Sequence, residues 1–167
     1  MEVKDLLQKF WVDFYIPTQD EDSSFPYANP SDASRSLIKA RNWTGTLTEK
    51  LVEISFSLAG RKRDLRAFQE QYFSVERVIL AREEKIFAYI TKSKELLKAF
   101  IWSKADRDEI TMITVLEEDI SKLIYDIHVL DSEKEIIQEV LKKLDKTTDW
   151  LVQYINWMKI EARLGNG

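Results

Sequence analysis

The sequence contains no cysteine, which excludes disulfides, thiolate nucleophiles and cysteine-ligated zinc. It has only four glycines and three prolines in 167 residues, whereas turn-rich β-sandwiches and barrels need many of both. A single histidine, His128, cannot form a histidine cluster for a metal. Gly45 and Gly60 stand alone, so no glycine-rich phosphate loop is present. We therefore expect no cofactor, no metal and no enzymatic activity.

Long apolar runs and targeting signals are also lacking. The longest uninterrupted apolar run, 86–90, has five residues, against the roughly 20 that a membrane span needs. The first five residues include two acids, Glu2 and Asp5, where a secretory signal carries bases. We expect a cytoplasmic protein with no membrane partner.

Two heptad stretches, over 51–100 and 113–162, dominate the chain. At alternating spacings of three and four, twelve of fifteen positions in the first stretch and thirteen of fifteen in the second are apolar, while Arg61, Arg82 and Lys134 also lie on these seams. A 3.5-residue period held over this length predicts a left-handed supercoiled seam. The short break near 103–106 favours neighbouring helices that run antiparallel. The expected fold is all-α, a long coiled-coil-like antiparallel hairpin over 46–167. The expected pairs across it are Phe100 with Ile113, Ile86 with Ile127, and Ile54 with Met158.

Residues 1–45 are predicted to hold short N-terminal helices and an irregular arm. The apolar spacing predicts a helix from Val3 to Tyr15, and Pro17 prevents its continuation. A second short helix is expected from about Ser31 to Asn42. Capping boxes are predicted where Thr46 precedes Glu49 and where Asp106 precedes Glu109, because each pair has the required spacing.

Apolar side chains off the seam indicate association. A lone hairpin buries one seam per helix, so the large aromatic residues on the other faces need a cover. We expect a homo-oligomer, with Trp102, Trp150 and Trp157 buried between subunits or under the N-terminal helix.

Charge is unevenly distributed along the chain. The net charge is −4, yet residues 35–104 carry fifteen Lys and Arg against eight Asp and Glu. Cations interleaved with aromatic rings are typical of proteins that bind single-stranded nucleic acid. An alternative is that these bases pair with the acidic segment 105–167. The candidate nucleic-acid-binding residues are Arg61, Lys62, Arg63, Arg66, Arg77, Arg82, Lys85, Lys92, Lys94 and Lys98.

Both ends of the chain resemble a known family. The opening segment 6–16, LLQKFWVDFYI, carries a tryptophan, an acid and an isoleucine on an amphipathic helix. The closing segment holds Trp150, Ile155, Trp157 and Lys159 before a glycine-ended tail, and segment 77–82, RVILAR, is basic. These segments are similar to those of UvsY-type recombination mediators of T4-like phages. The chain differs from that pattern by a long arm after Ile16 and by Asn156, where an acid is usual.

The resemblance implies a homo-oligomeric ring that binds single-stranded DNA in the host cytoplasm. It implies a recombination mediator, which helps to load a recombinase onto DNA coated by a single-strand-binding protein. Neither nucleotide hydrolysis nor metal is required. The competing hypothesis is a non-enzymatic helical adaptor, scaffold or inhibitor that acts through protein–protein contacts.

Overall fold

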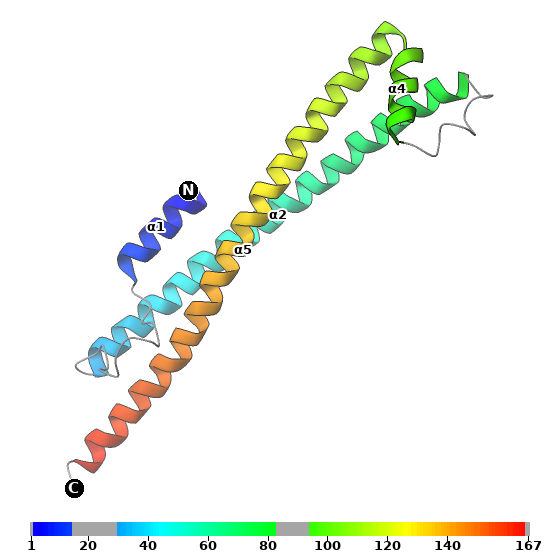
Figure 1. Ribbon diagram of the computed structural model, residues 1–167. Helices are drawn as coiled ribbons and strands as arrows, with labels where there is room; N and C mark the ends of the chain where they lie inside the picture. Colours follow the sequence, from blue (N-terminus) through cyan, green and yellow to red (C-terminus); the bar gives the residue numbers. More distant parts are fainter. Residues whose placement is uncertain (1, 15–29, 83–93, 166–167) are drawn as a thin grey trace. The chain divides into compact units, whose positions relative to one another are not determined.

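The computed structural model describes residues 2–14, 30–82 and 94–165, and within these ranges the chain is helical and has no strand (Figure 1). The helices are α1 (Val3–Asp13), α2 (Pro30–Arg82), α4 (Lys94–Lys104) and α5 (Arg107–Leu164). The described residues outside them are Glu2, Phe14, Ala105, Asp106 and Gly165. The expected all-α class is confirmed.

The second helix is longer at its start than expected. Because α2 runs without interruption over 53 residues, the separate short helix ending near Asn42 is wrong, and so is the capping box at Thr46. The Thr46 hydroxyl donates instead to the Asn42 carbonyl one turn back, at 3.2 Å. Fully buried Leu47 lies in the same turn, so packing offsets the roughly 1 kcal/mol that Gly45 costs a helix interior.

The first helix matches its expected start and covers part of α2. It ends at Asp13, with Phe14 extended, while Tyr15 lies outside the described residues. Phe10 is fully buried and meets the Trp43 ring edge-on, with centroids 5.4 Å apart. The sequence pattern therefore identified an N-terminal helix that shields an aromatic residue of α2.

The chain divides into two compact units, residues 1–56 with 131–167 and residues 57–130. In the first unit, Ala33 of α2 forms a buried cluster with Leu151, Tyr154 and Ile155 of α5, and Met158 packs against it. Ile54 lies 21 positions after Ala33, about 31 Å along the helix. The expected pairing of Ile54 with Met158 is therefore wrong.

In the second unit, α4 forms part of the core. Ile79 of α2, Ile101 of α4 and Ile113 of α5 form one cluster, and each is almost fully buried. The expected seam continued through Leu96 and Phe100, but Leu96 is 64% exposed and Ile101 takes the buried position. This part of the first heptad stretch is wrong because α4 is a separate helix with its own buried face. The expected pairing of Ile86 with Ile127 includes a residue outside the described ranges.

The turn before α5 is confirmed. Ala105 and Asp106 separate α4 from α5, within the expected span. The backbone N–H of Asp106 donates to Glu109 Oε2 at 3.0 Å, and the Glu109 N–H donates to Asp106 Oδ1 at 2.9 Å. This reciprocal pair is the predicted capping box.

The second heptad stretch is also confirmed as a seam of low exposure. From Ile113 to Met158, every residue at its heptad positions is buried or half-buried, and the last position, Ala162, is exposed. Much of the helix's stability therefore comes from burial of this face, because isolated helices gain little from propensity alone.

Candidate nucleic-acid interface

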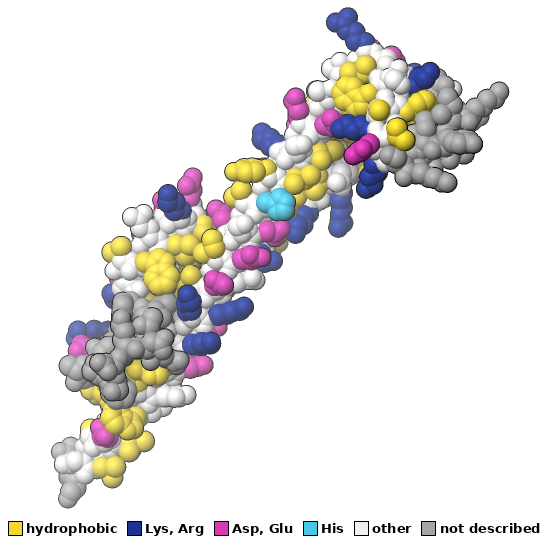
Figure 2. Space-filling model, in the orientation of Figure 1, with side chains coloured by type: hydrophobic (Ala, Val, Ile, Leu, Met, Phe, Trp, Pro, Cys, Tyr) yellow, Lys and Arg dark blue, Asp and Glu magenta, His cyan; other side chains and the backbone are white. Residues whose placement is uncertain are grey.

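The structure places the described candidate cations on the surface of the 57–130 unit. Lys85 and Lys92 lie outside the described residues. All the others are exposed, six of them on α2 and two on α4: Arg61, Lys62, Arg63, Arg66, Arg77, Arg82, Lys94 and Lys98. Figure 2 shows Lys and Arg side chains interspersed with Asp and Glu on the visible face.

Three of these cations form ion pairs with acids at the turn or on α5. Arg61 Nη2 lies 3.5 Å from Asp126 Oδ2, and Lys98 Nζ lies 2.8 Å from Glu117 Oε1. The Arg82 guanidinium contacts the Glu109 carboxylate, and Arg82 Nη1 lies 3.9 Å from Asp106 Oδ2. The alternative pairing of bases with the acidic segment therefore holds for these three residues.

A different set of cations shares one face of α2. Arg63, Arg66, Phe73 and Arg77, which we call the cationic stripe, lie three, seven and four positions apart, which keeps their side chains on one face of the helix, and the exposed acid Glu70 lies on the same face between Arg66 and Phe73. All four are exposed, and 52% of the Phe73 surface is accessible to solvent. Arg63 Nε lies 3.7 Å from Asp64 Oδ1, whereas neither Arg66 nor Arg77 forms an ion pair with a described residue. The stripe spans 14 positions, about 21 Å along the helix.

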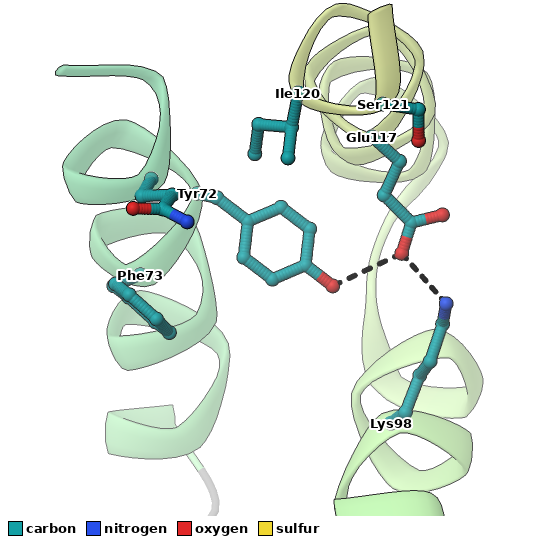
Figure 3. A pocket seen from close by; sticks show the side chains of 7 residues that line it. Tyr72, Phe73, Lys98, Glu117, Ile120 and Ser121 are labelled. Carbon is teal, nitrogen blue, oxygen red and sulfur yellow. Dashed lines mark hydrogen bonds and ion pairs between the residues drawn. The ribbon is translucent and has the colours of Figure 1, made fainter. Parts of the chain in front are cut away.

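A shallow groove of about 380 Å³ opens beside Phe73. Three helices of the unit line it, through Gln69, Tyr72 and Phe73 of α2, Lys98 of α4, and Glu117, Ile120 and Ser121 of α5. In Figure 3 the Tyr72 side chain crosses from α2 towards α5 and its hydroxyl reaches Glu117. The hydroxyl donates to Glu117 Oε1 at 3.1 Å, and Lys98 Nζ contacts the same oxygen at 2.8 Å.

Burial and charge together shift two titrating groups near the groove. Burial raises the pKa of the Tyr72 hydroxyl far above its usual range, and the nearby carboxylates of Glu76 and Glu117 add to the shift. Burial also raises the pKa of Glu76, an effect that its contact with Tyr72 opposes. Tyr72 therefore remains a protonated hydrogen-bond donor to Glu117 throughout the neutral range.

The three tryptophans proposed for an oligomer interface occupy different environments. Trp102 is half-buried and packs against the Ile79, Ile101 and Ile113 cluster, and Trp150 packs against the cluster around Leu151. Tyr154 stacks on Trp150 with centroids 5.3 Å apart, and on Trp157 at 6.1 Å. Trp157 keeps 44% of its surface exposed. Trp102 and Trp150 thus contribute to the cores of their own units.

The sequence did not reveal the groove. Lys98 lies 25 to 29 positions after the lining residues of α2 and 19 to 23 positions before those of α5, and neither Gln69 nor Ser121 belongs to a motif. The alternating spacings that start at Leu51 and at Ile113 include Tyr72 and Ile120, and this is the one signal in the sequence that the two helices meet here.

Other kinds of site have little support in the described ranges. They contain no group of three or more His, Asp or Glu side chains placed to hold a metal ion. No helix among them combines the length and apolar character needed to cross a bilayer. His128 is exposed on α5.

Comparisons with protein-family models, with curated proteins and with solved structures give no match to this chain.

Proposed function

We propose that the protein binds single-stranded DNA through the cationic stripe of α2. The observation that carries the proposal is the exposure of Arg66 and Arg77 on the same face as Phe73, without ion pairs to described residues. Guanidinium groups bind phosphates, and exposed aromatic rings stack on unpaired bases. This combination supports binding with little sequence preference.

The proposed role is that of a recombination mediator. The protein would help to load a recombinase onto DNA covered by a single-strand-binding protein, without catalysing a reaction itself. The support for this role is the resemblance of both chain ends and of segment 77–82 to UvsY-type mediators. The recombinase and the single-strand-binding protein are accordingly its proposed protein partners.

The proposal includes an antiparallel coiled-coil-like hairpin of α2 and α5 that forms homo-oligomers. Contacts within each unit support the helix directions: Ala33, near the start of α2, meets Ile155 near the end of α5, and Ile79 meets Ile113. For association, the support is an exposed apolar face at the end of α5, made by Trp157, Ile160 and Leu164 at 3-4 spacing. In an oligomer, the stripe repeats and weak contacts add through multivalency.

The test is fluorescence anisotropy with a labelled oligo-dT at two salt concentrations. Affinity should fall with salt, with a slope of about −0.7 per phosphate neutralised. Two double variants, Arg66→Glu with Arg77→Glu and Lys62→Glu with Arg63→Glu, should each weaken binding by at least about tenfold. The matched control is Lys142→Glu with Lys143→Glu, an equal charge change at exposed positions of α5. Equal losses in all three variants would show that the stripe is not the binding site.

The second candidate is the helical adaptor, scaffold or inhibitor. The observation that favours it is charge balance: residues 57–130 contain thirteen Lys and Arg and thirteen Asp and Glu, and Arg61, Arg82 and Lys98 already have acidic partners. If the folded, oligomeric parent binds no oligo-dT at low salt, this candidate replaces the first. Light scattering measures the oligomeric state in the same samples.

A further inference from the structure

We infer that the groove beside Phe73 receives an unpaired nucleobase of a bound strand, an inference that rests on the proposed function. Phe73 belongs both to the cationic stripe and to the groove wall. Arg66 and Arg77 lie seven positions before and four positions after it, about 10 and 6 Å along the helix. A strand whose phosphates contact these two guanidinium groups passes the mouth of the groove.

The size and the walls of the groove fit a single base. Its volume of about 380 Å³ is near the lower end of the roughly 300–1,000 Å³ typical of small-ligand sites. Phe73 offers a half-exposed ring, and the Tyr72 ring and Ile120 supply further apolar surface (Figure 3). Aromatic rings hold bases irrespective of sequence, because every base has a π-face.

The polar groups of the groove are compatible with an anionic strand. Among the described residues that line it, Glu117 is the one carboxylate, and the Tyr72 hydroxyl and the Lys98 ammonium both contact its Oε1. The positive charge of Lys98 offsets the negative charge of Glu117, so the described lining residues together carry no net charge. The Gln69 amide and the Ser121 hydroxyl add hydrogen-bonding groups suited to base edges.

The inference predicts that affinity depends on the presence of bases as well as phosphates. The parent protein should bind oligo-dT at least about tenfold more tightly than an abasic strand of equal length and charge, since stacking on one ring is worth that much. Phe73→Leu keeps apolar bulk but removes the ring. It should reduce this ratio towards one by weakening oligo-dT binding and leaving abasic binding unchanged.

The matched control is Tyr125→Leu. Tyr125 is a 69% exposed aromatic residue of α5 in the same unit, outside the groove and the stripe. The Tyr125→Leu substitution should leave the ratio of oligo-dT affinity to abasic-strand affinity unchanged. A second measurement uses the parent protein alone: a strand carrying 5-iododeoxyuridine is irradiated, and mass spectrometry locates the adduct, which we expect on Phe73 or Tyr72.

The outcomes separate this inference from the proposed function. If neither strand binds the parent, both are wrong. If the parent binds the two strands equally, or if adducts form only on residues outside the groove, the base site is wrong. Phosphate binding by the cationic stripe is then still supported. The same change of ratio in Phe73→Leu and Tyr125→Leu also overturns the base site.

Discussion

Trp43 Nε1 donates a 2.8 Å hydrogen bond to Asp13 Oδ2, which joins the last turn of α1 to α2. Lys39 Nζ donates to the other carboxylate oxygen at 3.0 Å. The Trp43 hydrogen bond is the largest cause of a pKa of Asp13 below its ordinary value, and the Lys39 contacts add to it. The attachment of α1 therefore combines apolar burial of Phe10 with a charge-assisted hydrogen bond.

Acid should weaken this attachment. Because the pKa of Asp13 is lowered in the folded protein, its contribution is present above the ordinary pKa of 3.8 and is lost as the pH falls through the folded value. Thermal unfolding between neutral pH and pH 3 should therefore show a smaller acid-induced decrease for Asp13→Asn than for the parent. Asp5→Asn, a change at an exposed acid of the same helix, is the control and should follow the parent.

The core position of α4 should be sensitive to truncation. Ile101 is almost fully buried between α2 and α5, so Ile101→Ala should lower the free energy of unfolding by about 2–5 kcal/mol. Leu96→Ala, at a 64% exposed position of α4, should change it by no more than about 0.5 kcal/mol. Urea denaturation of both variants measures the difference. A larger loss of stability in Leu96→Ala than in Ile101→Ala would contradict this prediction and favour an uninterrupted heptad seam through Leu96.

The capping box at the start of α5 gives a third prediction. Asp106→Ala removes the acceptor for the Glu109 N–H and should cost about 1 kcal/mol in the free energy of unfolding. Asp108→Ala removes an equal charge from the same helix terminus without removing the cap, and should cost less. Chemical denaturation at neutral pH measures the free energy of unfolding of the two variants and of the parent. Equal costs would assign the effect to charge alone.

Glu76 should respond to pH in the opposite sense to Asp13. Burial raises its pKa, so the folded state binds more protons than the unfolded state and stability falls as the pH rises through the folded value. Glu76→Gln should therefore raise the melting temperature at pH 8 and have less effect near pH 4. Glu70→Gln, at an exposed position of the same helix, should leave the melting temperature nearly unchanged at both values. A lower melting temperature for Glu76→Gln at pH 8 would contradict this prediction.

Local patterns predicted the elements that depend on nearby residues. The spacing of Leu6 and Phe10 identified α1, the second heptad stretch identified the buried face of α5, and the Asp106–Glu109 spacing identified its N-terminus. The same reasoning failed at Thr46, because its hydroxyl has an equally good partner in the Asn42 carbonyl of a continuous helix. Cap spacing alone does not distinguish these two hydrogen bonds.

By itself, the sequence determined that the protein is helical, where the apolar faces lie, and which α2 side chains carry positive charge. Helix formation and the apolar faces follow from spacings of three and four residues within a helix, and the charge follows from the residue types. Only the tertiary structure decided which faces meet: Ile113 packs with Ile79 and Ile101, and Met158 packs with the cluster that contains Ala33. Most layers of a heptad seam are apolar, so the spacing alone does not specify which layer of one helix meets which layer of the other. The contacts between helices pair Arg61, Arg82 and Lys98 with acids, whereas the cationic stripe is exposed. They also form the groove beside Phe73.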